Sequence, residues 1–329
     1  MEFLRFLESI RTGIGDFFFS TVTRMGEEVF FLAIAILFYW CISKRQGYYI
    51  LMTGVVGSVI NQWLKIICRI PRPWIIDPDF KPVGDAVAEA TGYSFPSGHT
   101  QNIAGTWGCI GRYNKQKWVK IISVSLILLV AFSRMYLGVH TPLDVTVSLG
   151  VAAALVFAFH FVFRTEESVN KYMFWVMMGA VVFSIGFILY VFLLPESGFA
   201  SEADLANLLS AKKNAATLTG CLFGLALVYP LDRFVIKFDT KGRWYAQIIK
   251  FVVGVAVVLG IKSGLSKPLV ALFGNEYVAR AVRYFLIVAF AGGVWPLTFK
   301  FFERLRIEKL ERFTEWIVSK FKKAEEASE

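Results

Sequence analysis

The chain has 329 residues, of which 56% are hydrophobic and only 18% are charged, and its formal net charge at pH 7 is +10. This composition excludes an ordinary soluble globular protein, in which charged residues make up about a quarter of the chain. The mean hydropathy of +0.56 predicts instead an all-α membrane protein with several spanning helices. The positive charge requires no nucleic-acid partner, because basic residues gather at the cytoplasmic surface of membrane proteins.

Residues 1–27 are predicted to form an interfacial amphipathic helix. Apolar residues recur at helical spacing from Phe3 to Phe17, and charged residues such as Glu2, Arg5 and Asp16 occupy the other faces. Such a helix lies in the plane of the membrane surface with its apolar side toward the lipid.

About nine transmembrane helices are predicted to follow, because long apolar segments recur along most of the chain. A spanning helix needs about 17 to 25 residues. The predicted spans are 28–43, 47–68, 98–112, 118–137, 141–163, 173–194, 214–232, 244–265 and 278–297.

The basic C-terminal tail, residues 298–329, is predicted to form an amphipathic helix on the cytoplasmic leaflet. Eight Lys and Arg residues lie between Lys300 and Lys323, beside an apolar stripe that runs from Ile307 to Phe321. A helix surrounded by water is the alternative. With nine spans, the side that includes this tail holds 21 of the 35 Lys and Arg residues, so the positive-inside rule makes it cytoplasmic.

Three polar clusters lie on the opposite, non-cytoplasmic side, and the first is Lys65 with Arg72 and Pro73. A lysine near the end of a span often extends its amine to the membrane surface and has no further role. The placement of Lys65 seven residues before an Arg-Pro pair favours a different interpretation, in which both cations hold an anion. The prolines around Arg72 keep this segment from continuing the helix.

The second cluster is the run Pro96, Ser97, Gly98 and His99, where a loop enters a predicted span. The first N–H groups of a helix have no carbonyl partner within the helix and form a natural anion site. Gly98 permits a backbone turn that aims these groups at one point. Ser97 adds a hydroxyl group, and His99 is placed to protonate a leaving oxygen.

The third cluster is Ser133, Arg134, His140 and Asp144. His140 and Asp144 are four residues apart and therefore share one face of a helix. The carboxylate can then bind one imidazole nitrogen and fix the tautomer, which leaves the other nitrogen free as a nucleophile. A helix cap or a purely structural pair is the alternative for these two residues.

The three motifs K-x6-R-P, P-S-G-H and S-R-x5-H-x3-D resemble, in order and placement, the type 2 phosphatidic acid phosphatase superfamily. That superfamily also includes glucose-6-phosphatase, sphingosine-phosphate phosphatases and the vanadium haloperoxidases. The resemblance covers about residues 28–165. It implies that the phosphate group is bound by Lys65, Arg72, Ser97, Gly98 and Arg134.

The same resemblance implies that His140 attacks phosphorus, that Asp144 orients it, and that His99 is the general acid. It divides the chain into the interfacial helix at 1–27, a catalytic helical core at 28–165, a four-helix extension at 166–297 and the tail at 298–329. The nine-span layout is similar to that of glucose-6-phosphatase. No cofactor or metal is expected, because no cluster of carboxylates has metal-ligand spacing. The oligomeric state stays open.

Three functions remain open at this point. The first is hydrolysis of a lipid phosphate or diphosphate, such as phosphatidate, phosphatidylglycerol phosphate or an isoprenyl diphosphate, through a phosphohistidine at the non-cytoplasmic face of the cell membrane. The second is hydrolysis of a soluble phosphoester. The third is transport or binding of a phosphate compound, against which the presence of His99, His140 and Asp144 argues. Haloperoxidase activity fits least, since those relatives are soluble.

Overall fold

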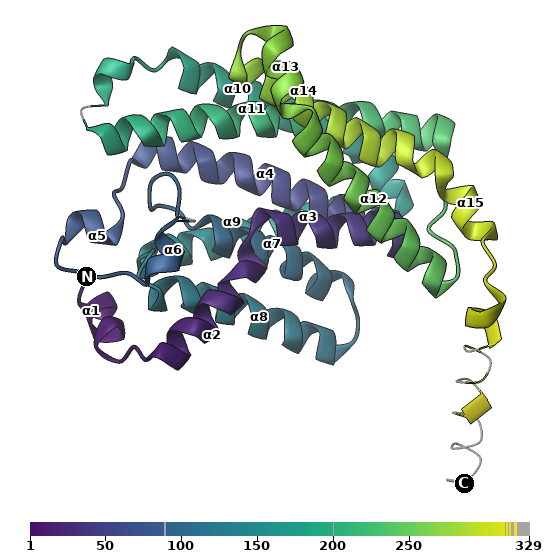
Figure 1. The fold of residues 1–329 in the computed structure, drawn as a ribbon, viewed down its shortest axis with the longest axis horizontal. Helices are drawn as coiled ribbons and strands as arrows, with labels where there is room; N and C mark the ends of the chain where they lie inside the picture. The colour runs from purple at the N-terminus through teal and green to yellow at the C-terminus, as the bar shows by residue number, and fades with distance from the viewer. Residues whose placement is uncertain (89, 200, 313, 315, 317–318, 321–329) are drawn as a thin grey trace.

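The computed structural model describes residues 1–88, 90–199, 201–312, 314, 316 and 319–320. Within these residues every regular element is helical, which confirms the predicted all-α class (Figure 1). The α-helices are α1 (Glu2–Ser9), α2 (Gly13–Thr23), α3 (Glu28–Leu37), α4 (Lys44–Cys68), α5 (Pro73–Ile76), α6 (Gly84–Ala88), α7 (Gly98–Tyr113), α8 (Lys117–Tyr136), α9 (Pro142–Phe163), α10 (Glu166–Leu193), α11 (Glu202–Leu231), α12 (Trp244–Gly264), α13 (Ser266–Phe273), α14 (Glu276–Ala289) and α15 (Phe299–Arg304).

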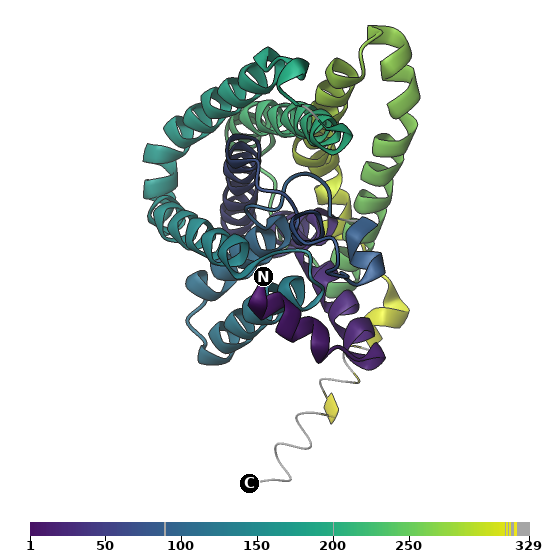
Figure 2. The ribbon, with the colours of Figure 1, turned by 90° about the vertical axis from the view of Figure 1, so that its left-hand side faces the viewer.

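Helix α4 is the central helix of the bundle. It packs against α7 and α9 on one side and against α10 and α11 on the other, and Figure 2 shows it enclosed by other helices. In its most apolar stretch 61% of the residues are buried, whereas the corresponding share in α12 is only 11%. Helix α4 therefore joins the two halves of the chain, and α12 presents most of its surface to the surroundings.

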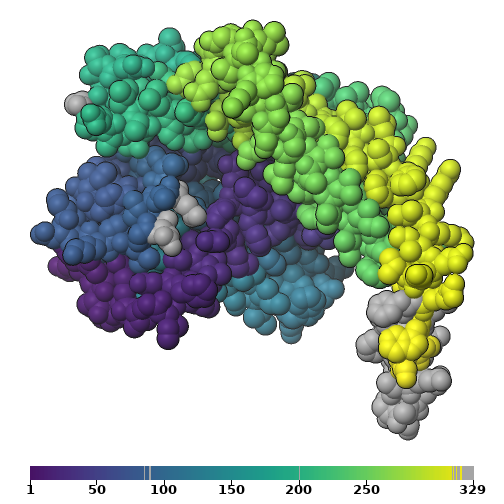
Figure 3. All heavy atoms as spheres, in the orientation of Figure 1, coloured from purple at the N-terminus to yellow at the C-terminus, as the bar shows by residue number. Residues whose placement is uncertain are grey.

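The C-terminal helices pack across α3 and its continuation, and form the arm seen in the space-filling view (Figure 3). The contact centres on Trp40, which is fully buried among the rings of Phe251, Trp295 and Phe299. Its indole N–H donates to the carbonyl of Ala291 at 2.8 Å. The two halves of the sequence thus share one hydrophobic core.

Each of the nine predicted spans coincides with a helix, but the count of nine stays a prediction. Seven helices of the described chain are long and apolar enough to cross a membrane. Helix α3 meets this test only together with α2, from which it is bent by 51°. Helix α7 has 16 residues, several of them polar, and is not among the seven.

The N-terminal segment differs from the single amphipathic helix that was predicted. The structure has two helices there, because the chain breaks after Ser9 and Thr12 caps the next helix by accepting a hydrogen bond from the N–H of Gly15. Leu4 and Leu7 are buried against Phe80, so α1 covers the loop that follows α5. The helical spacing of the apolar residues continues across this break, so the sequence pattern did not predict it.

The basic tail is described only in part. Helix α15 ends at Arg304, and the remainder of the predicted amphipathic helix lies partly outside the described residues. The chain after α15 contacts the start of α12, where Arg243 Nε lies 2.8 Å from a carboxylate oxygen of Glu311.

Candidate active site

The three polar clusters meet where five elements begin or end. Lys65 lies in the last turn of α4, Arg72 precedes α5, and Gly98 begins α7. Arg134 lies in the last turn of α8, and His140 precedes α9. Helices that end at one place can direct several side chains at one point while the bundle keeps them rigid.

Arg72 is held by backbone carbonyls on two loops. Its guanidinium donates to the carbonyls of Gly92 at 3.1 Å, Thr91 at 2.8 Å and Val139 at 2.9 Å. Gly92 has a φ of +71°, a conformation that residues with a side chain rarely adopt, so glycine allows this loop to turn toward Arg72. Arg72 is only 5% exposed, so these contacts fix both its position and its charge.

Lys65 is anchored in the same loop, through a hydrogen bond from its amine to the carbonyl of Tyr93. The hydroxyl of Tyr93 in turn donates to Asp204 at 2.9 Å, at the start of α11. Burial and this carboxylate raise the pKa of Tyr93 to about 12, so the hydroxyl stays protonated and keeps donating. The C-terminal half of the chain thereby reaches the loop that positions Lys65.

His140 lies between a cation and a carboxylate. Its Nε2 is 3.0 Å from Arg72 Nη1, and its Nδ1 is 3.5 Å from Asp144 Oδ2. Because a guanidinium can only donate, Nε2 accepts, and the proton of the neutral ring is on Nδ1, which faces Asp144. Burial and the positive charges of Arg72, Arg134 and Lys65 lower the pKa of His140 well below its ordinary value. The imidazole is therefore neutral at physiological pH.

Asp144 is oriented by two hydrogen-bond donors. One of its oxygens, Oδ2, accepts from the N–H of Thr141 at 2.7 Å and from the hydroxyl of Ser94 at 2.6 Å, and faces His140. Thr141 and Asp144 form a reciprocal capping box, and Pro142 occupies the first turn, so the start of α9 is fixed by local sequence. The cap that was the alternative interpretation of Asp144 is therefore present, together with the contact to His140.

Ser97 caps α7, since its hydroxyl oxygen accepts from the N–H of Thr100 at 3.4 Å and from the Thr100 hydroxyl at 3.0 Å. Gly98 is the first residue of that helix. His99 Nε2 is buried and has no hydrogen-bond partner among the described residues. The positive charges of Arg134, Arg72 and Lys65 act on this ring as they do on His140. All eight predicted site residues thus lie at one place in the fold.

Arg134 is fully buried and connects α8 to the N-terminal helices. Its Nη1 donates to the hydroxyl of Thr23 at 2.7 Å, and its carbonyl accepts from the N–H groups of Val139 and His140. The N-terminal helices therefore form one wall of the site. Gly26, three residues after Thr23, packs directly against His99. A Cβ at Gly26 would lie 2.8 Å from the Cβ of His99, so only glycine allows this approach.

Sequence reasoning missed several residues that contact the site, among them Thr23, Tyr93 and Ser94. Ser94 lies three residues before Ser97, and that proximity was the one available signal. Tyr93 and Thr23 each bond to a residue 111 positions away, which no local pattern indicates. In the part of the chain that the structure describes, no three His, Cys, Asp or Glu residues gather closely enough to hold a metal ion.

Comparison with known proteins places this geometry in a family. The family model of the PAP2 superfamily matches residues 45–168, and the model of the PAP2 superfamily phosphatase transmembrane extension matches residues 216–308. The chain therefore belongs to the PAP2 superfamily, in the group that carries a transmembrane extension. No solved structure gives a significant match.

Several curated proteins are similar to this chain. A probable sphingosine-1-phosphate phosphatase of Dictyostelium discoideum is 26% identical over 62% of this chain and 55% of its own length. Undecaprenyl-diphosphatase BcrC of Bacillus subtilis is 34% identical over 36% of this chain and 58% of its own length. Phosphatidylglycerophosphatase B of the same species is 28% identical over 41% and 69%. The chain spans little more than half the length of the first of these relatives.

Proposed function

We propose that this protein is an integral-membrane phosphatase that hydrolyses a lipid phosphate or diphosphate through a phosphohistidine, at the non-cytoplasmic face of the cell membrane. The observation that carries the proposal is the position of His140, a buried neutral imidazole with Arg72 at 3.0 Å on one nitrogen and Asp144 at 3.5 Å from the other. A neutral nucleophile suits an anionic ester, because it is not repelled by the phosphate charge.

Substrate binding prepares this nucleophile. The phosphate group takes Lys65, Arg72 and Arg134 as its cationic partners and the first N–H groups of α7 as further donors. A phosphate oxygen replaces His140 Nε2 as the acceptor of the Arg72 Nη1 proton. The lone pair of Nε2 is then free to face phosphorus, and Nδ1–H, which lies 3.5 Å from Asp144 Oδ2 before binding, comes within hydrogen-bond distance of it.

In the first chemical step a bond forms between Nε2 and phosphorus while the bond from phosphorus to the ester oxygen breaks. The negative charge of the bound phosphate offsets the cations around His99, so the ring binds a proton before this step. Protonated His99 then donates that proton to the departing alkoxide, which leaves as an alcohol. Asp144 stabilises the positive charge that develops on the imidazole. The cations stabilise the equatorial oxygens of the transition state.

In the second step water attacks phosphorus and gives a proton to His99, which is now neutral. The bond between phosphorus and Nε2 breaks, inorganic phosphate leaves, and His140 and His99 regain their starting states. These residues complete both steps without a metal ion.

A lipid substrate suits the position of the site. The site lies where helices end, so a headgroup at the membrane surface can reach it while its chain stays among apolar side chains. Phosphatidate, phosphatidylglycerol phosphate and isoprenyl diphosphates are the candidate substrates. The names of the relatives above include sphingosine phosphate, undecaprenyl diphosphate and phosphatidylglycerophosphate as substrates of those proteins.

The test is phosphate release by the purified full chain in detergent from a panel of lipid phosphates, lipid diphosphates and sugar phosphates. We expect lipid substrates to be hydrolysed in excess EDTA, and vanadate to inhibit by occupying the phosphate site. His140→Ala should lower kcat by at least about a thousandfold while the protein remains folded. Release from sugar phosphates alone would support the soluble-substrate alternative. Loss of activity to EDTA, restored by magnesium or zinc, would refute the mechanism.

A further inference from the structure

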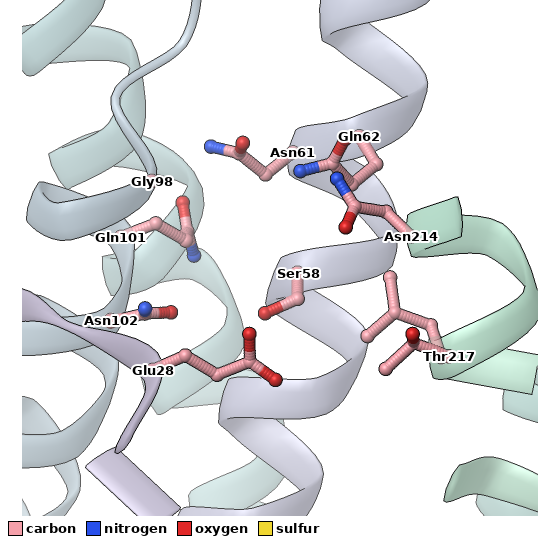
Figure 4. Close-up of a pocket in the computed structure, with 10 residues that line it drawn as sticks. Glu28, Ser58, Asn61, Gln62, Gly98, Gln101, Asn102, Asn214 and Thr217 are labelled. Carbon is pink, nitrogen blue, oxygen red and sulfur yellow. The ribbon is translucent and has the colours of Figure 1, made fainter. Parts of the chain in front are cut away.

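A polar cavity of about 100 Å³ lies beside the site, where α3, α4 and α7 face α11 (Figure 4). Its lining includes Asn61 and Ser58 from α4, Gln101 from α7 and Thr217 from α11. Gln101 is only 3% exposed, yet neither atom of its amide has a hydrogen-bond partner among the described residues, and the same holds for Asn61 Oδ1. Buried amides without partners indicate a place where a polar ligand or water binds.

The cavity adjoins the phosphate site at the start of α7. Gly98, the first residue of α7, lines it directly and lies between Ser97 and His99 in the sequence. Asn61 joins it to the same loop, because its Nδ2 donates to the carbonyl of Pro96 at 3.4 Å. A group bound in this cavity would therefore lie next to a phosphate held at the start of α7.

A second cavity, of about 210 Å³, adjoins the first, and its lining is mostly apolar, with Glu28 and Lys262 as its charged residues. Helices α3, α4, α11, α12 and α14 enclose it with residues that include Leu32, Val55, Leu225 and Val258. Glu28 lines both cavities, so they meet at its side chain. Ligand cavities are typically lined by apolar side chains with a small number of polar groups, as this one is.

We propose that the two cavities together bind a single lipid phosphate, with its hydrocarbon chain in the apolar cavity and its polar linker in the polar cavity; this rests on the proposed phosphatase function. The order of environments from His140 inward is cationic, then amide-rich, then apolar. A lipid phosphate has the same order of phosphate, linker and chain.

The carboxylate of Glu28 restricts which chemical groups the polar linker of the lipid can carry. Among the described residues, Glu28 is the only charged side chain that lines the polar cavity, and the positive charges of Lys262 and Arg280 favour its carboxylate form without an ion pair to it. A carboxylate accepts hydrogen bonds and does not donate them. The linker that fits carries a donor, a hydroxyl or an ammonium group, beside the phosphate ester. An isoprenyl diphosphate has an anionic linker and fits this cavity poorly.

The transmembrane extension helps to enclose the hydrocarbon chain of the substrate. The helices α11, α12 and α14 supply one side of the chain cavity, and α3 and α4 supply the other. A second apolar groove exists between α7, α8 and α9, where Trp107 and Phe157 line it. That groove shares no lining residue with the polar cavity, whereas the chain cavity shares Glu28 with it, so a chain bound in the groove would not lead to the phosphate site.

The first experiment compares chain lengths. The ratio of kcat/KM for hexadecyl to butyl phosphates, each with a β-hydroxyl group, is measured for Ala33→Trp and Val258→Trp, which fill the cavity from α3 and from α12. We expect the ratio to fall about tenfold or more, since burial of two methylene groups suffices for that. The matched control is Val252→Trp on the exposed face of α12, which should keep the wild-type ratio. An unchanged ratio in both cavity variants would overturn the chain site.

The second experiment locates the chain without turnover. A lipid phosphonate that cannot be hydrolysed, with a photoreactive diazirine in its chain, is cross-linked to the full chain in detergent and mapped by mass spectrometry. We expect cross-links at residues such as Leu225 and Val258. Cross-links at Trp107 or Phe157 instead would overturn the proposal even if the enzyme hydrolyses lipids. Cross-links as expected, with no phosphate release from any lipid, would refute the phosphatase function alone.

The third experiment tests the linker. Wild type should hydrolyse β-hydroxyhexadecyl phosphate with a kcat/KM about tenfold above that of hexadecyl phosphate, since one hydrogen bond to a charged group is worth that much. Glu28→Gln should remove most of this preference. The same substitution at the adjacent Glu27, which lines neither cavity, should keep it. Equal rates for both substrates in wild type would refute the role of Glu28.

Discussion

Removal of the Ser94 hydroxyl group is the sharpest test of how the site is organised. Ser94 is fully buried, and its Oγ donates to Asp144 Oδ2 at 2.6 Å, the same oxygen that faces His140 Nδ1. In Ser94→Ala the oxygen Oδ2 keeps the N–H of Thr141 as a donor but loses its second hydrogen bond. Asp144 can then rotate away from His140, and the imidazole loses its orientation.

The expected loss follows from the strength of this bond. A hydrogen bond to a charged group contributes about 1.5 to 3 kcal/mol, and about 1.4 kcal/mol corresponds to a tenfold change in rate. We therefore expect Ser94→Ala to lower kcat by about ten- to a hundredfold, with little change in KM. The measurement is phosphate release under saturating lipid substrate in detergent, together with a thermal unfolding curve for each variant.

The matched control is Ser184→Ala in α10. Ser184 is also fully buried, and its hydroxyl donates at 2.8 Å to the carbonyl of Val181 in its own helix, far from the site. This control should keep the wild-type kcat. Because Ser94 acts through Asp144, Ser94→Ala should add little to the loss caused by Asp144→Asn. A wild-type kcat in Ser94→Ala, full additivity with Asp144→Asn, or an equal loss in the control would each refute the reasoning.

Three further changes test other contacts of the site. Tyr93→Phe removes the bond to Asp204 and loosens the loop that positions the phosphate-binding lysine, so KM should rise about three- to tenfold with kcat nearly constant; an unchanged KM would contradict this link. The low pKa of His140 keeps its imidazole neutral in the folded protein, whereas in the unfolded chain the same imidazole gains a proton below about pH 6.5. Thermal stability should therefore fall as the pH drops below that value, because the unfolded state binds the extra proton. The fall should be less steep in His140→Gln, which cannot bind this proton. In the pH profile of kcat/KM, the acid limb that belongs to His140 should lie below pH 6.5, and a limb above it would refute the assignment. Gly26→Ala pushes a methyl group against His99 and should lower kcat about tenfold or more, whereas Gly13→Ala, where a Cβ meets no other atom, should have little effect.

Local sequence determined the helices and the placement of most site residues. Apolar segments long enough to span a bilayer became helices. The bilayer core contains no water to bind backbone N–H and C=O groups, and a helix pairs these groups with one another within the segment. Capping and proline signals fixed where α7 and α9 begin, so Ser97 and Asp144 could be placed at helix starts from the sequence. The spacing of four residues predicted that His140 lies beside Asp144, and the structure has this contact. The predicted shared helix face was wrong, because His140 precedes α9 and Thr141 between them is extended.

Tertiary packing decided which of these residues touch. The bonds of Ser94 to Asp144, of Arg72 to His140 and of Tyr93 to Asp204 join residues 50, 68 and 111 positions apart. Such pairs depend on how helices pack against one another, and side-chain periodicity contains no information about which helices become neighbours. The break that turned one predicted N-terminal helix into α1 and α2 has the same origin. Leu4 and Leu7 are buried against Phe80 in the loop after α5. This packing, and not the helical period of the segment, determines where α1 ends.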